Sequence, residues 1–75
     1  MTAVDVCFRY VTPPGEREMR ALERLWEVYG IRRIDFNEQE QTVRVEYDAT
    51  RFSAELVAAL LRRAGIDVRE QVVLA

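Results

Sequence analysis

Few side chains in this sequence have the chemistry needed for catalysis or for holding a metal ion. Histidine, the commonest general base and the commonest metal ligand in proteins, is absent from all 75 residues. A single cysteine, Cys7, rules out an internal disulfide and leaves one thiol. The sequence also lacks a Gly-rich phosphate-binding loop and an isolated pair of carboxylates. We therefore expect that the protein is not an enzyme and that it uses no cofactor.

Two weak candidate sites lie near the N-terminal end. Cys7 could act as a lone thiolate ligand, but its place in an alternating run puts it on the open face of a strand. There we expect a small, partly exposed filler. Segment 12–15 precedes a predicted helix, whose free N–H groups together with Arg17 could bind an anion. Because proline removes donors and Glu16 and Glu18 are negative, we expect this segment to be a rigid connection.

The third candidate is an apolar ridge on the first predicted helix. Helical spacing assigns the buried centre of this helix to residues at steps of four and three: Ala21, Leu25 and Val28. Met19, Leu22 and Trp26 then fall on its flank or outer face. Since Trp is over-represented at interface hot spots, we interpret these three residues as a surface for a protein partner or for self-association. In the alternative interpretation, Trp26 folds over the edge of the second helix or the last strand.

The elements that would position these residues follow one another without a linker or repeat. Apolar and polar residues alternate over 4–10, and again over 34–36 and 43–47 around a polar turn, which predicts a strand and a hairpin. Helices are predicted over about 14–29, ended by Gly30, and between Ser53, a good N-cap, and Gly65. A last strand is expected over 68–74. The βαββαβ order predicts an α+β, ferredoxin-like fold, with both helices on one face of a four-stranded antiparallel sheet.

The composition predicts an ordinary globular protein in a single domain spanning residues 1–75. It is 49% hydrophobic and 32% charged, with a net charge of −2 that favours neither nucleic acid nor an anionic membrane. The aromatic residues of the strands have core parity, which argues against RNA recognition by the open face of the sheet. No apolar run approaches the roughly 20 residues that span a bilayer, and the lone thiol fits a reducing compartment, so we expect a cytoplasmic protein.

Several short motifs occur together at a spacing typical of one family: Gly30-Ile31, Val45-Glu46-Tyr47-Asp48, an apolar stripe within 56–64, and Gly65-Ile66-Asp67. On these motifs, residues 4–68 resemble the heavy-metal-associated domains of copper chaperones and metal-pumping P-type ATPases. The resemblance implies a sheet with strand order 4-1-3-2. It also implies that a metal ion would bind at the loop between the first strand and the first helix.

The metal-binding signature of that family, Gly-Met-x-Cys-x-x-Cys, is not present in this loop. Its two cysteines would fall at Pro14 and Arg17, and its methionine at Thr12. Cu(I) and Zn(II) are selected by thiolates, whereas proline offers no donor atom and arginine repels a cation. We therefore predict a small binding or interaction module on a heavy-metal-associated-type scaffold, without high-affinity soft-metal binding of its own. The alternative is a metal-transport or metallochaperone-type domain that binds a heavy metal ion weakly or through an atypical site.

Overall fold

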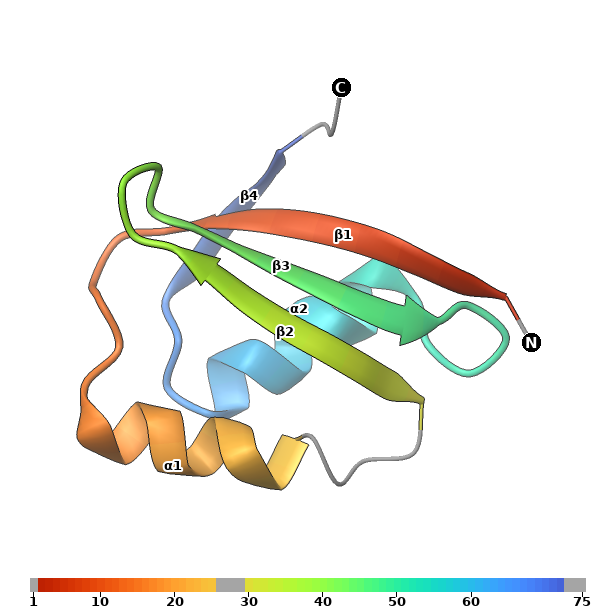
Figure 1. Cartoon of the computed structure of the whole chain (residues 1–75), viewed down its shortest axis with the longest axis horizontal. Helices are drawn as coiled ribbons and strands as arrows, with labels where there is room; N and C mark the ends of the chain where they lie inside the picture. The colour runs from red at the N-terminus through yellow and green to blue at the C-terminus, as the bar shows by residue number, and fades with distance from the viewer. Residues whose placement is uncertain (1, 26–29, 73–75) are drawn as a thin grey trace.

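Four strands and two helices follow one another in the order that the sequence predicts. The computed structural model describes residues 2–25 and 30–72. Its elements are β1 (Ala3–Tyr10), α1 (Glu16–Leu25), β2 (Ile31–Asn37), β3 (Thr42–Asp48), α2 (Ala54–Arg63) and β4 (Val68–Val72). The strands form one antiparallel sheet in the order β2-β3-β1-β4, which confirms the order 4-1-3-2 and the ferredoxin-like fold (Figure 1). Positions 26–29 and 73–74, assigned above to the first helix and the last strand, lie outside the described residues.

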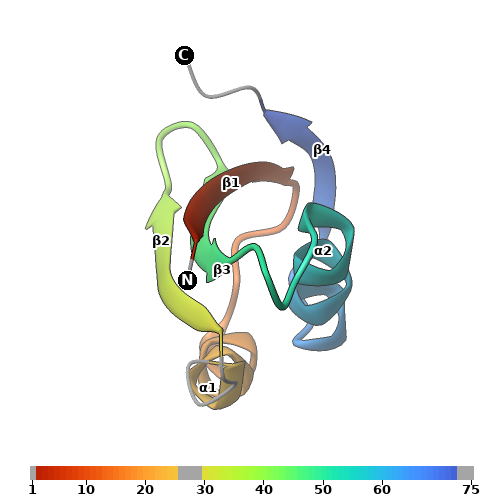
Figure 2. The same cartoon turned by 90° about the vertical axis from the view of Figure 1, so that its right-hand side faces the viewer.

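Both helices lie under the same face of the sheet. Figure 2 shows the strands curving over α1 and α2, with α2 beside β4. The start of α1 is near the end of α2, since a side chain built at Gly65 would lie 3.0 Å from Cγ of Glu18. Among the described residues, neither helix is long and apolar enough to cross a membrane.

The core forms between the sheet and the helices, from alternate positions of each strand. In the central pair, Val6 lies opposite Val45 and Phe8 opposite Val43, and each is at most 5% exposed. Because successive side chains of a strand point to opposite faces, the residues between them belong to the open face. The helices close the core with a few buried side chains: Leu22 from α1, and Val57, Ala58 and Leu61 from α2.

The signals predicted at the two ends of the second helix hold in α2. The hydroxyl oxygen of Ser53 accepts a hydrogen bond from the backbone N–H of Leu56 (3.2 Å), as an N-cap does. Gly65 follows α2 with a φ of +97°, and Gly30 precedes β2 with a φ of +110°. Gly30 also has no room for a side chain, because a Cβ there would lie 2.4 Å from the ring of Phe52.

The orientation of α1 differs from the prediction. Helical spacing predicts Ala21 and Leu25 at the buried centre, but both are only half-buried, whereas Leu22 is 2% exposed. Two overlapping apolar stripes run along this helix, and spacing alone does not determine which of them packs on the sheet. In α2, Leu56 belongs to the apolar stripe predicted within 56–64, yet it is 44% exposed.

Candidate functional site

The loop between β1 and α1 closes the start of the helix with its own residues. The backbone N–H of Met19 donates to the carbonyl oxygen of Gly15 (3.0 Å), which forms the first turn. The N–H of Gly15 donates to Oε1 of Glu18 (3.3 Å). A carboxylate of the chain therefore occupies the helix N-terminus, where a bound anion would otherwise lie. In the same loop, Pro14 is half-buried and Arg17 is exposed.

A small hollow lies beside this loop. It has a volume of about 180 Å³ and is lined by Tyr10, Pro13, Pro14, Met19, Phe36 and Glu38. The rings of Tyr10 and Phe36 meet edge to face, with their centroids 5.7 Å apart. Burial, and to a smaller degree the charge of Glu38, raises the pKa of Tyr10 above its usual value, so its hydroxyl is protonated at neutral pH. The hollow can accept one apolar side chain, but it offers no thiolate.

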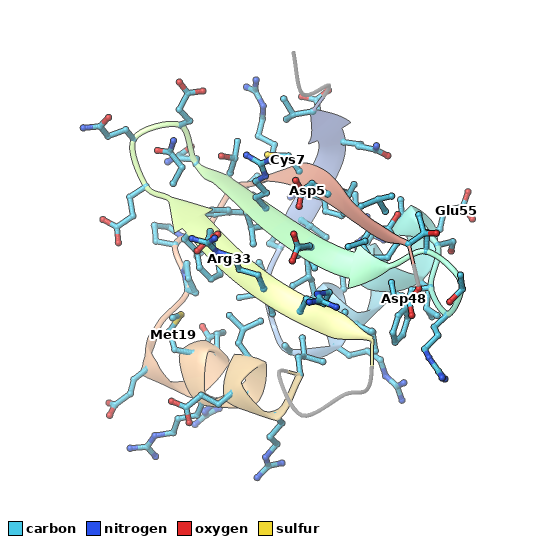
Figure 3. The ribbon with its side chains drawn as sticks, turned by 45° about the vertical axis from the view of Figure 1, so that its right-hand side comes forward. Asp5, Cys7, Met19, Arg33, Asp48 and Glu55 are labelled. Carbon is cyan, nitrogen blue, oxygen red and sulfur yellow. The ribbon has the colours of Figure 1, made fainter. Side chains whose placement is uncertain are left out.

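Cys7 lies on the open face of the sheet as predicted, but its predicted partial exposure is wrong. Only 6% of the residue is exposed. The reason is its place in β1, where its neighbours in the adjoining strands are Arg44 and Val72. Figure 3 shows Cys7 on the sheet and Met19 on α1, well apart. The thiol and the thioether of the described residues therefore do not form a pair of ligands.

The loop residues do not fit a soft metal ion. Pro14 provides no donor atom, and the guanidinium of Arg17 carries a permanent positive charge. The thioether of Met19, in the hollow beside the loop, is a single neutral donor where the family signature would supply two thiolates. Over residues 2–25 and 30–72, no group of three or more His, Cys, Asp or Glu side chains is arranged to hold a metal ion.

The predicted apolar ridge on the first helix is only partly present. Met19 is 43% exposed, at the border of the hollow. Leu22 packs in the core and cannot reach a partner, so its assignment to the ridge is wrong. The physical reason is the rotation of α1, which turns this position toward the sheet. Trp26 lies outside the described residues.

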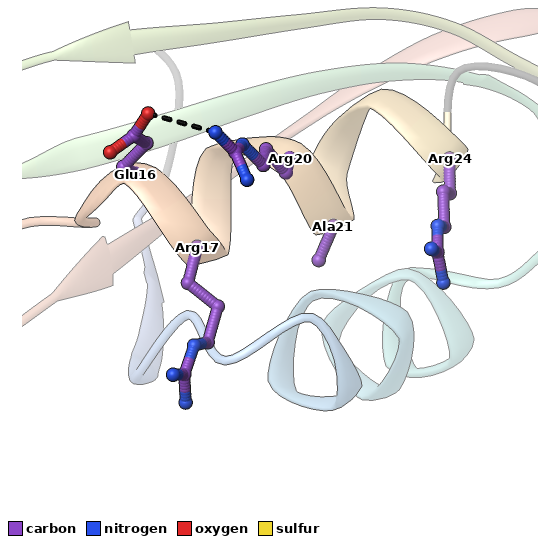
Figure 4. A pocket seen from close by; sticks show the side chains of 5 residues that line it. All are labelled: Glu16, Arg17, Arg20, Ala21 and Arg24. Carbon is purple, nitrogen blue, oxygen red and sulfur yellow. Dashed lines mark hydrogen bonds and ion pairs between the residues drawn. The ribbon is translucent and has the colours of Figure 1, made fainter.

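A surface that sequence reasoning missed lies on the opposite flank of α1. It is an open groove of about 550 Å³ lined by Glu16, Arg17, Arg20, Ala21 and Arg24. Figure 4 shows Arg17, Ala21 and Arg24 projecting toward α2, while Glu16 and Arg20 lie on the other side. A second open groove, of about 440 Å³, continues between the helices and is lined by Ala21, Arg24, Leu25, Leu60, Arg63 and Ala64. The signal in the sequence is the recurrence of Arg17, Ala21 and Arg24 at steps of four and three.

The open face of the sheet carries charges that are paired with one another. The guanidinium of Arg44 donates to Oδ2 of Asp5 (2.6 Å), and this hydrogen bond and the carboxylate charge raise the pKa of Arg44. Arg33 pairs with Asp35 at 2.7 Å. These four residues and Glu46 line a hollow of about 230 Å³. The result is a mixed, internally matched surface.

Comparison with known proteins supports the fold. No protein-family model matches the sequence, and no curated protein matches it. Among solved structures, the solution structure of apo-CopP from Helicobacter pylori is similar, with a TM-score of 0.70. The two sequences are 24% identical, and the match covers 88% of this chain and 100% of CopP. At this identity the likeness shows the shared ferredoxin-like fold alone.

Proposed function

We propose that this chain is a protein-binding module on the scaffold of the heavy-metal-associated domains, without high-affinity binding of a soft metal ion at its first loop. The observation that carries the proposal is the chemistry of that loop, where Pro14 and Arg17 fall at the positions that the family resemblance assigns to two cysteines. The fold shared with apo-CopP supports this alignment. We take the module to be a single, non-enzymatic domain over residues 1–75, and its lone thiol suits the cytoplasm.

Replacing the second cysteine by Arg17 does more than remove a ligand. It puts a positive charge where a thiolate would be negative. Two like unit charges about 4 Å apart repel by about 1 kcal/mol in water and by about 4 kcal/mol near a protein surface of lower dielectric constant. Because Arg17 is exposed, we expect the lower part of that range. The loop therefore opposes a cation in addition to lacking its donors.

Competition against a chromophoric chelator tests the proposal. The reduced protein is titrated with Cu(I) and, separately, with Zn(II). We expect the wild type to hold either ion no more tightly than an unrelated protein with one thiol, and Cys7→Ser to behave like the wild type. Stoichiometric binding that survives Cys7→Ser would contradict the proposal, since it would require a site made by other residues.

The second candidate is a metal-transport or metallochaperone-type domain, and the observation that favours it is the fold shared with apo-CopP. In this alternative an ion binds weakly, or through an atypical site that includes the exposed thioether of Met19. Mass spectrometry of protein purified without a chelator separates the two candidates. Metal retained at one ion per chain, and lost in Met19→Leu, would support the second.

A further inference from the structure

We infer that the groove between α1 and α2 binds an acidic amphipathic helix of a partner protein. This inference deepens the proposed protein-binding function, on which it rests, by giving the chemistry of the partner. The α1–α2 groove has an apolar floor, formed by Ala21, Leu25, Leu60 and Ala64, and a basic rim, formed by Arg17, Arg24 and Arg63.

The floor has the shape that a third helix needs. Ala21 on α1 and Ala64, which caps the C-terminal end of α2, are small, so that the two helices leave open a groove of about 440 Å³. The apolar strip continues along α2, because Leu56 lies one helical turn before Leu60 and is 44% exposed. From Leu56 to Ala64 the strip is about 12 Å long, at about 1.5 Å per residue, which matches two turns of a docked helix.

The rim is positive and unneutralised. Arg17, Arg24 and Arg63 are exposed, and none of them has an ion-pair partner within the part of the chain that the structure describes. On α1, the acidic side chain of Glu16 lies on the other flank, where it pairs with Arg20 at 3.0 Å (Figure 4). Glu18 also lies at this flank, near Gly65 at the end of α2, and its carboxylate accepts a hydrogen bond from the N–H of Gly15. Three guanidinium groups against this one carboxylate leave the flank positive, and carboxylates of a partner would complement it.

Helix stability explains part of the rim but not all of it. Arg24 and Arg63 lie in the last turns of their helices, where positive charge is favourable for the macrodipole. Arg17 lies in the first turn of α1, where the same dipole makes a positive charge unfavourable. The helix itself therefore gains nothing from a guanidinium at that position, whereas an anionic group bound in the groove would make it favourable.

The partner chemistry follows from the combination of floor and rim. The net charge of −2 gives the whole chain no attraction for nucleic acid or for an anionic membrane. A row of guanidinium groups along an apolar strip instead selects a segment that presents both small apolar side chains and carboxylates. An amphipathic helix with Asp or Glu beside an Ala and Leu stripe meets both conditions.

Titration calorimetry with a synthetic peptide tests this inference. The peptide is about 18 residues long, enough to form a helix, and carries an Ala and Leu stripe flanked by Glu. Its control has Gln in place of every Glu. We expect the full-length wild-type chain to bind the Glu peptide, more weakly as ionic strength rises, and to bind the Gln peptide at least about tenfold more weakly.

Two matched variants locate the site. Arg17→Gln/Arg24→Gln/Arg63→Gln removes three charges from the rim, and Arg9→Gln/Arg33→Gln/Arg69→Gln removes three from the sheet side. We expect the rim variant to lose at least about tenfold in affinity and the sheet variant to stay within about twofold. Ala21→Gln, which fills the floor, should also abolish binding, and circular dichroism checks that each variant is folded.

Several outcomes would overturn the inference. These are equal losses in the two triple variants, equal binding of the Glu and Gln peptides, or stronger rim-dependent binding to phosphatidylserine vesicles than to the peptide. Rim-dependent dimerisation in sedimentation, without peptide binding, would identify a second copy as the occupant. If the chain binds both the peptide and a soft metal ion, the groove stands, and only the proposed absence of high-affinity metal binding is refuted. A chain that takes up no metal and binds no peptide would refute the groove alone.

Discussion

The two faces of this molecule hold their arginines in different ways. All 11 basic residues of the chain are arginines. On and beside the sheet they lie next to carboxylates: Arg9 with Glu70, Arg33 with Asp35, Arg44 with Asp5, and Arg69 with Asp67. On the helical face, Arg20 pairs with Glu16, but Arg17, Arg24 and Arg63 have no such neighbour among the described residues. The density of charge is therefore a poor sign of a binding surface, whereas unmatched charge is a better one.

The difference has a simple energetic basis. A carboxylate arriving at the sheet face would compete with a carboxylate already in place, so one ion pair would replace another. A carboxylate arriving at the α1–α2 groove would make a new pair and break none. Exposed ion pairs are each worth only about 0–1 kcal/mol, so the contrast depends on several arginines acting together. The predictions below test the two faces in order of expected effect.

The largest effect is expected on the buried side of α1. Leu22 is 2% exposed, and Leu22→Ala should lower the free energy of unfolding by about 2–5 kcal/mol. That is a large part of the roughly 4–11 kcal/mol expected for a chain of 75 residues. Met19→Ala, at a position 43% exposed, should change it by less than about 1 kcal/mol. Urea unfolding of both variants measures this, and equal losses would show that the orientation of α1 is wrong.

The second effect concerns the loop that joins the two faces. Pro14→Cys with Arg17→Cys should create a soft-metal site, because it supplies two thiolates and removes a repelling charge. We expect Cu(I) to bind at least about a hundredfold more tightly than to the wild type, as measured by chelator competition under reducing conditions. The carboxylate of Glu18, which accepts from the N–H of Gly15, opposes formation of a nearby thiolate. Adding Glu18→Gln should therefore strengthen binding further.

One result would remove the basis of the proposed function. A folded double variant that takes up no more metal than the wild type would mean that this loop does not occupy the position of the family's metal loop. Gly30, Tyr47 and Gly65 would then mark a general ferredoxin-like fold, and the family resemblance should be withdrawn.

The sequence predicts the sheet better than it predicts the helical face. Strand alternation decides which side of each strand is buried, since a shift of one residue would expose the whole apolar set. Ser53, Gly30 and Gly65 act through local backbone chemistry, which is why they are recognisable without a structure. The rotation of α1 depends on tertiary packing instead. Two stripes have helical spacing: residues 19, 22 and 26, and residues 21, 25 and 28. Periodicity alone therefore could not decide which of the two packs on the sheet.

The groove was missed for a related reason. Its floor and rim come from two helices that are far apart in the sequence, and half-buried alanines carry no signal of their own. Arg17 was considered only for an anion site at the start of the helix, and Arg24 was not singled out. Whether an arginine has a partner depends on residues that the fold brings near it. The predicted exposure of Cys7 was wrong for the same reason, because the residues beside it belong to the neighbouring strands β3 and β4.

The third effect concerns a paired carboxylate that is buried. Asp48, which is 4% exposed, accepts hydrogen bonds from Oγ1 (2.6 Å) and the N–H (3.0 Å) of Thr50, and these bonds lower its pKa. A lowered pKa in the folded state stabilises the protein above the unfolded pKa of about 3.9, and this contribution is lost as pH falls through the folded value. Thr50→Val removes one bond, so we expect it to destabilise the protein at neutral pH, and less in acid. Urea unfolding of the wild type and of Thr50→Val at neutral and at acidic pH measures this difference. A loss of stability that is the same at both pH values would show that Thr50→Val acts through packing and not through the pKa of Asp48.

The smallest effects are expected for single arginine variants on the two faces. Their stability changes should have opposite signs, which makes them the most direct test of the comparison. Arg44→Gln breaks the ion pair with Asp5, so we expect a small loss of stability. Arg17→Gln breaks no pair among the described residues and removes a positive charge from the first turn of α1, so stability should rise by about 0.3 kcal/mol. High salt should shrink both changes, because the charges are exposed. Denaturant unfolding at low and high ionic strength provides the measurement. If Arg17→Gln instead destabilises the folded chain, this guanidinium already has a stabilising role, and it should not be counted as a charge held ready for a partner.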